Sequence, residues 1–115
     1  MVNVSGYVPE RGDLVWLNFD PQKGSEQAGI RPALVLSRAA YNRFGLCLLC
    51  PVTSKIKGYP FEVVLPEDSA IHGAVLCDQI RSVDWRARQV KKAGEIKPDT
   101  MKNVTSFSSG LVQGK

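Results

Sequence analysis

The run Asp13-Leu14-Val15-Trp16-Leu17-Asn18-Phe19 decides the fold class, because it is apolar and rich in strand-forming residues. Gly12 precedes this run and Asp20-Pro21 follows it, as is typical of the two ends of a strand. Runs of similar composition predict further strands, at residues 32–36, 46–52, 61–65, 74–80 and 90–96. The chain is therefore predicted to be mainly β.

Polar segments separate these strands. Residues 20–29 contain almost no apolar side chains and predict a long loop, and loops of this length are usually functional or mobile. Residues 54–60 predict a second polar loop that carries two lysines. Residues 38–44 predict a single helical turn, and residues 83–88 predict a short turn.

The C-terminal segment is the best candidate for a helix. Pro98 suits the first helical position, and Asp99 suits the positive end of the helix dipole. Residues at helical spacing form a stripe, flanked by Phe107, that comprises Met101, Val104, Ser108 and Leu111. Because serine and glycine are poor helix formers, a short helix that frays after Gly110 is predicted.

The 115 residues suit one domain, spanning 1–115. The pattern predicts one small, strongly bent sheet of five to seven strands, forming a partly open barrel with a C-terminal helix. No run of about 18 apolar residues is present, so a membrane-spanning helix is not expected. The first residues lack the pattern of a secretory signal, and the expected location is the cytoplasm.

Charge is distributed unevenly along the chain. Up to Ile80 there are seven basic and eight acidic residues, whereas from Arg81 onward there are eight basic and three acidic residues. A one-sided excess of positive charge suits a polyanionic partner. The alternative interpretation is an ordinary solvated surface.

Cysteine and histidine content restricts the chemistry. Three cysteines are an odd number and argue against a disulfide framework. Cys47 and Cys50 have the spacing of a metal or redox motif, but residues three apart in a strand point to opposite faces, so core positions are predicted for both. His72 is the only histidine, which excludes histidine-rich zinc sites and a nuclease with two histidines within one chain.

Four groups of residues stand in a specific order: Gly12-Asp13-Leu14-Val15-Trp16; Gly24-Ser25-Glu26-Gln27-Ala28-Gly29-Ile30-Arg31-Pro32-Ala33; Pro51-Val52-Thr53-Ser54 with Lys57-Gly58-Tyr59-Pro60-Phe61-Glu62-Val63; and Asp78-Gln79-Ile80-Arg81-Ser82-Val83-Asp84. Together they resemble the signature of the MazF/PemK toxin family, over roughly Tyr7 to Ile96. The C-terminal helix matches that family by position rather than by sequence.

The resemblance implies an SH3-like barrel with a C-terminal helix that works as a homodimer. It also implies the toxin of a toxin–antitoxin pair, an endoribonuclease that needs no metal or other cofactor. Such enzymes cleave single-stranded RNA by attack of the 2′-hydroxyl, which leaves a 2′,3′-cyclic phosphate and a 5′-hydroxyl. The implied partner is an antitoxin whose acidic, disordered segment covers the RNA groove.

By the resemblance, Arg31 and Thr53 match the catalytic arginine and threonine of the family. A guanidinium can hold two phosphate oxygens and stabilise their developing charge, and a threonine hydroxyl can orient the scissile phosphate. Without the motif, Arg31 would be interpreted as a surface residue and Thr53 as an ordinary strand end.

Further residues are candidates for RNA binding: Ser25, Glu26, Gln27, Lys57, Asp78, Gln79, Arg81 and Arg86. Glu26 is also considered as a base, and Arg88 is considered with Arg81 and Arg86 as part of a phosphate track. Some relatives have an arginine two positions before Asp78, whereas this chain has Leu76, so base recognition or a structural role is assigned to Asp78. Each tryptophan could stack a base or pack in the core.

Two other functions remain open. Toxins with the same barrel bind a topoisomerase without cleaving anything, so the fold alone does not give the activity. A non-catalytic RNA-binding module is the other alternative, although such a protein has no need of Thr53 after its strand.

Overall fold

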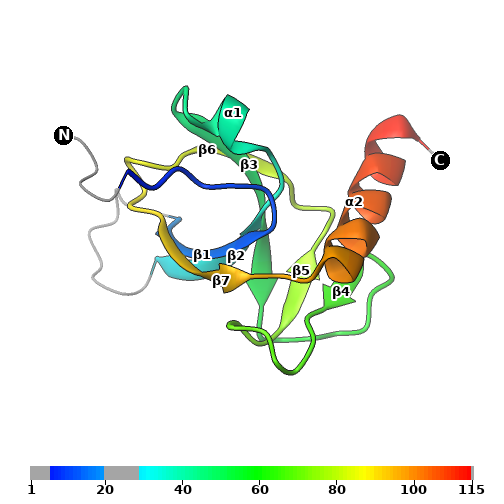
Figure 1. Cartoon of the computed structure of the whole chain (residues 1–115). Coiled ribbons are helices and arrows are strands. Elements are labelled where there is room, and N and C mark those ends of the chain that lie inside the picture. Colours follow the sequence, from blue (N-terminus) through cyan, green and yellow to red (C-terminus); the bar gives the residue numbers. More distant parts are fainter. Residues whose placement is uncertain (1–5, 20–28, 115) are drawn as a thin grey trace.

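A computed structural model describes residues 6–19 and 29–114 of the chain (Figure 1). The described elements are β1 (Asp13–Asn18), β2 (Ile30–Val35), α1 (Ala39–Asn42), β3 (Leu46–Thr53), β4 (Glu62–Val64), β5 (Ala74–Leu76), β6 (Arg81–Asp84), β7 (Lys91–Glu95) and α2 (Pro98–Gln113). The strands form one antiparallel, strongly bent sheet of seven strands. This architecture confirms the predicted mainly β fold with a C-terminal helix.

Strand β3 organises the sheet. The strand order is β4-β5-β3-β2-β1-β7, and β6 also pairs with β3. The first half of β3 pairs with β6, from Leu46 opposite Asp84 to Leu49 opposite Arg81. Its last two residues pair with β5 instead, with Thr53 opposite Ala74. One long strand therefore joins the barrel to the β4–β5 hairpin.

The core is divided between the two faces of β3. Cys47 and Leu49 belong to a cluster inside the barrel, together with Trp85 of the turn after β6. Cys50 and Val52 belong to a second cluster that lies under α2. The two cysteines of the Cys-x-x-Cys spacing thus point to opposite faces and are buried, as predicted.

The three thiols are free and buried. Burial raises the pKa of Cys47 and of Cys50 to about 12, and the pKa of Cys77 to about 11. Because the thiolate is the reactive form, these cysteines are inert core side chains near neutral pH.

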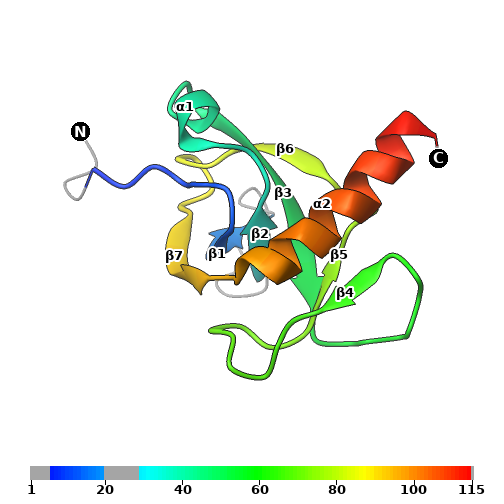
Figure 2. The same cartoon turned by 45° about the vertical axis from the view of Figure 1, so that its right-hand side comes forward.

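Helix α2 covers the second core cluster. Figure 2 shows α2 crossing in front of the sheet, and its Met101 and Val104 pack with Leu14 and Leu34 from β1 and β2. The predicted stripe is confirmed at Met101, Val104 and Ser108, whereas Leu111 is exposed. The helix continues past Gly110 to Gln113, because Gly114 adopts the left-handed conformation that caps a helix end.

Several boundaries differ from those predicted, and the three largest differences among the strands are as follows. β2 begins at Ile30, two residues before the predicted start, because β1 pairs with it as far as Asn18 opposite Ile30. The predicted strand over residues 74–80 ends at Leu76. Residues 81–84, part of which was predicted as a turn, form β6 because β3 offers them a free edge.

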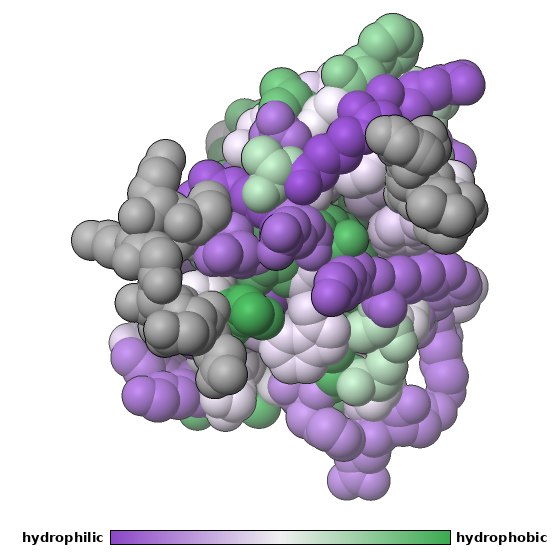
Figure 3. Space-filling model, turned by 90° about the vertical axis from the view of Figure 1, so that its left-hand side faces the viewer, coloured by the Kyte–Doolittle hydropathy of each residue, from purple (hydrophilic) through white to green (hydrophobic). Residues whose placement is uncertain are grey.

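None of the described helices is long and apolar enough to cross a membrane. Figure 3 shows one face of the molecule, on which hydrophilic side chains lie between smaller hydrophobic areas.

Asn42 connects four parts of the fold and is fully buried. Its Nδ2 donates to the carbonyl oxygens of Pro9 (2.7 Å) and Ser37 (2.8 Å), and its Oδ1 accepts from the Ser37 hydroxyl (2.5 Å). Its backbone carbonyl accepts a hydrogen bond from Trp85 Nε1 (2.6 Å). Helix α1 therefore serves as an anchor for the N-terminal segment and the β6 turn.

We expect Asn42→Ala to lower the free energy of unfolding by about 3 kcal/mol, because two buried carbonyl oxygens lose their donor. Urea denaturation measures this loss. Asn103→Ala is the matched control, since Asn103 is exposed on α2, and it should change stability by less than about 0.5 kcal/mol. Equal effects of the two substitutions would contradict the anchoring role.

Candidate active site

A groove of 920 Å³ opens beside the ends of β1, β2 and β3. It is bordered on its other sides by the segment before β5, by the end of β5 and by the start of β6. The lining residues are Trp16, Phe19, Ile30, Arg31, Pro32, Pro51, Val52, Thr53, Ser54, Lys55, Ala70, Ile71, His72, Leu76, Gln79 and Arg81. Four of the predicted site residues, Arg31, Thr53, Gln79 and Arg81, meet in this groove.

Strand register brings Arg31 and Thr53 together. β2 and β3 pair antiparallel, with Ala33 opposite Pro51. Arg31 lies two residues before Ala33, Thr53 lies two residues after Pro51, and both residues line the groove. Two residues that are 22 positions apart in the sequence thus lie near the same end of two neighbouring strands.

The Thr53 hydroxyl has a defined orientation. Its Oγ1 accepts a hydrogen bond from the backbone N–H of Lys55 at 3.0 Å. A hydroxyl carries one donor hydrogen and two acceptor lone pairs. With one acceptor position used by Lys55, the hydrogen is available for a ligand in the groove.

Positive charge dominates the described lining. Arg31, Lys55 and Arg81 contribute cationic groups, and no carboxylate lies among the described lining residues. The guanidinium carbon of Arg81 lies 4.9 Å from the centre of the Phe19 ring, a cation–π contact that holds this side chain at the wall of the groove. Three cations without a neutralising carboxylate suit an anionic ligand.

Other predicted residues lie elsewhere. Lys57 is in the loop after β3, where its backbone N–H donates to the carboxylate of Glu62 (3.1 Å), and it does not line the groove. Asp78 is exposed outside the lining. Arg86 packs its guanidinium over the Trp85 ring, 4.5 Å from the centroid.

Arg88 has a structural contact instead of a place beside Arg81. Its Nη1 donates to the carbonyl oxygens of Asn18 (3.2 Å) and Phe19 at the end of β1. The structure therefore does not join Arg81, Arg86 and Arg88 in one track along the groove. Ser25, Glu26 and Gln27 lie outside the described residues.

Several residues of the site were not identified from the sequence, among them His72 as a lining residue and Gly73 as a spacer. Gly73 has φ +133°, and a Cβ there would lie 2.2 Å from the carbonyl oxygen of Thr53. Only glycine lets the chain pass so close to the end of β3. The only signal in the sequence was a glycine directly before the apolar run of β5. The sequence does not indicate which residue this glycine contacts.

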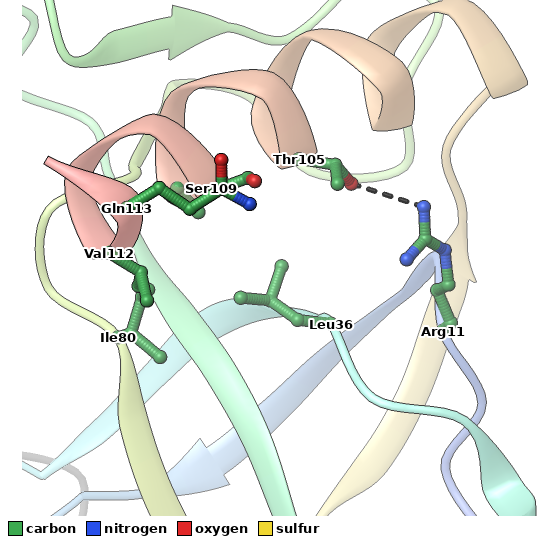
Figure 4. Close-up of a pocket in the computed structure, with 8 residues that line it drawn as sticks. Arg11, Leu36, Ile80, Thr105, Ser109, Val112 and Gln113 are labelled. Atoms are coloured by element: carbon green, nitrogen blue, oxygen red, sulfur yellow. Dashed lines mark hydrogen bonds between the residues drawn. The ribbon is translucent and has the colours of Figure 1, made fainter. Parts of the chain in front are cut away.

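A second, smaller hollow of 260 Å³ lies between α2 and the sheet (Figure 4). Leu36, Ile80 and Val112 give it an apolar lining, and Arg11 donates to the Thr105 hydroxyl at its edge (3.1 Å). It contains none of the predicted catalytic residues. In the described parts of the chain, no three His, Cys, Asp or Glu side chains are grouped as a metal site would require.

Comparison with known protein families matches residues 10–107 to PemK-like, MazF-like toxins of type II toxin–antitoxin systems. The chain belongs to this family. This confirms the resemblance that the sequence motifs indicated.

Individual MazF-like proteins support the assignment. The chain is 53% identical over 110 residues to the endoribonuclease toxin MazF of Escherichia coli K12, covering 95% of this chain and 98% of the relative. It is 42% identical over 91 residues to the endoribonuclease toxin ChpB of the same strain, covering 74% of this chain and 78% of the relative.

Solved MazF structures share the fold. The crystal structure of MazF from Deinococcus radiodurans matches with a TM-score of 0.83 and 53% identity, over 95% of this chain and 99% of that one. A MazE–MazF crystal structure from the same organism matches with a TM-score of 0.83 and 48% identity, over 93% and 97% of the two chains.

We expect Gly73→Ala to lower the free energy of unfolding by about 2–4 kcal/mol, because its Cβ would collide with the Thr53 carbonyl and its backbone φ would be strained. Thermal unfolding, together with the amide chemical shift of Thr53, reports both effects. Gly110→Ala serves as the control, because open space surrounds this glycine in α2 and the substitution should stabilise the protein by about 0.5–1 kcal/mol. An unchanged unfolding midpoint for Gly73→Ala would show that the contact is not tight.

Proposed function

We propose that this MazF-type endoribonuclease toxin is a sequence-selective, metal-independent enzyme that cleaves single-stranded RNA, mRNA included, in the groove containing Arg31 and Thr53. The 2′-hydroxyl attacks the adjacent phosphate, leaving a 2′,3′-cyclic phosphate and a 5′-hydroxyl. Loss of mRNA inhibits translation and growth. The observation that carries this proposal is the meeting of Arg31 and Thr53 in a cationic groove, in a chain of the MazF-like family.

In this reaction Arg31 and Thr53 have separate roles. The Arg31 guanidinium holds two phosphate oxygens and stabilises the charge that develops on phosphorus. The Thr53 hydroxyl, whose oxygen already accepts from Lys55, donates its hydrogen to the same phosphate and orients it. Arginine rarely gives up its proton, so Arg31 is assigned electrostatic stabilisation and not proton transfer.

The remaining predicted residues are proposed to bind RNA. Gln79 and Arg81 line the groove and can contact bases and phosphates there. Lys57, Asp78 and Arg86 are exposed and would contact RNA beyond the groove. Ser25, Glu26 and Gln27 are proposed to read base edges. Ile30 is 43% exposed at the groove, and its side chain cannot form a hydrogen bond with RNA. We therefore do not propose that this chain cleaves the same RNA sequence as its relatives.

Single-turnover cleavage of an oligoribonucleotide in excess chelator tests the proposal. Arg31→Ala should lower the rate about 10²–10³-fold, since it removes the main stabiliser of the phosphorane charge. Thr53→Val, which keeps the shape but removes the hydroxyl, should also lower the rate. A 2′-deoxy substitution at the cut site should abolish cleavage.

Arg43→Ala, at an exposed arginine after α1, is the control and should retain the wild-type rate. Cleavage that is lost in chelator, or that survives Arg31→Ala unchanged, would contradict the proposal. Inhibition of DNA supercoiling without cleavage of any RNA would indicate the topoisomerase-binding alternative.

We also propose that the chain forms a homodimer. Three apolar side chains on α2 support this, because Phe107, Leu111 and Val112 are 41%, 54% and 76% exposed. Val112→Glu should weaken the dimer about tenfold or more in sedimentation equilibrium, since a charge would be buried. Gln113→Glu places the same charge one residue away and should not. Dimers unaffected by Val112→Glu would contradict the use of this surface.

The proposed antitoxin carries an acidic, disordered segment that covers the groove, and the three lysine and arginine side chains of the lining suit such a segment. The three buried free thiols suit a reducing compartment, and we place the protein in the cytoplasm. An acidic peptide from a candidate antitoxin should compete with uncleavable RNA for the groove, and inhibition without competition would contradict this placement.

A further inference from the structure

The proposed cleavage needs a proton acceptor for the 2′-hydroxyl, and Arg31 and Thr53 do not supply one. The charged groups among the described lining residues are Arg31 from β2, Lys55 after β3 and Arg81 from β6. Guanidinium and ammonium groups donate hydrogen bonds but have no acceptor position. Ser54, Thr53 and Gln79 are polar but weakly basic. Among the described lining residues, one side chain remains with a basic nitrogen that can accept a proton in its neutral form, which is that of His72.

The fold holds His72 beside Thr53. Ile71 before it is buried in the core under α2, and Ala74 after it pairs with Thr53. Between them Gly73 lies so close to the Thr53 carbonyl that a Cβ would stand 2.2 Å from it. The Gly73 carbonyl in turn accepts from the Leu65 N–H at 2.8 Å. The backbone of His72 is therefore fixed on both sides, while its side chain is exposed and lines the groove.

The carboxylates of the segment between β4 and β5 lie outside the groove. Glu67 is exposed and does not line the groove, and Asp68 forms an ion pair with Lys97 of 2.8 Å. Glu26, considered above as a base, belongs to the undescribed residues. His72 thus shares the groove with Arg31, Lys55 and Arg81, and no carboxylate lies among the described lining residues.

We propose that His72 is the general base of the cleavage reaction, which rests on the proposed function. The neutral imidazole accepts the proton of the 2′-hydroxyl through its unprotonated nitrogen. The 2′-oxygen then forms a bond to phosphorus, the bond from phosphorus to the 5′-oxygen breaks, and that oxygen takes a proton from solvent. The imidazolium afterwards returns its proton to water, so the enzyme is unchanged.

Single-turnover cleavage by His72→Gln tests this assignment between pH 5 and pH 8. In the wild type, the cleavage rate should rise with pH, because a general base acts only in its unprotonated form. His72→Gln should lower the cleavage rate at pH 7.5 about 100-fold and flatten this profile. Binding of an uncleavable 2′-deoxy-substituted RNA should change less than about twofold, since the loss is in proton transfer.

Three controls make the result specific. Glu67→Gln, in the same segment but outside the groove, should retain both the rate and the pH profile. His72→Ala should recover activity when free imidazole is added, which a merely structural role would not allow. Unfolding midpoints of all variants establish that they fold.

Two results would overturn the assignment while leaving the proposed function intact: a His72→Gln enzyme with the wild-type rate and pH profile, or a profile that is flattened by Glu26→Gln and not by His72→Gln. A wild-type protein that cleaves no RNA would overturn both proposals.

Discussion

The rest of the structure depends on strand β3 being buried on both faces. Cys47 and Leu49 fill the barrel, and Cys50 fills the layer under α2. Both clusters contain side chains of the same strand. A shift of its register by one residue would therefore move each of these side chains to the opposite face of the strand and disrupt both clusters. The same constraint fixes Thr53 at the strand end. Core packing thus sets the position of Thr53, and the contacts of Thr53 and Arg81 in the groove add to it.

Much of this arrangement could be predicted from the sequence, because it follows from local pattern. Strands rich in apolar residues, the Pro98 start of α2 and the opposite directions of Cys47 and Cys50 all result from periodicity and backbone chemistry. The motifs also indicate Arg31 and Thr53 as candidates, although they do not show that β2 and β3 are neighbours. The strand β6 could not be predicted in this way, since it exists only because β3 has an edge to pair with.

The functional use of charge was the least predictable part. The basic excess after Ile80 indicated a continuous phosphate track, yet several of these cations are engaged within the protein. Arg88 binds carbonyl groups of β1, while Lys97 pairs with Asp68. Among the described cations of this region, Arg81 alone lines the groove, beside two cations from the more acidic part of the chain. Counting charges along a sequence cannot separate these roles, because they depend on which strands become neighbours.

The two tryptophans occupy very different surroundings. Trp85 is 3% exposed and its indole N–H donates to the Asn42 carbonyl at 2.6 Å, whereas Trp16 is 42% exposed at the groove. Indole emission shifts with contact to water, so each ring reports on a different event. The protein therefore carries two intrinsic fluorophores in different positions: Trp16 lies where a ligand in the groove would cover it, and Trp85 lies where loss of the folded core would expose it to water.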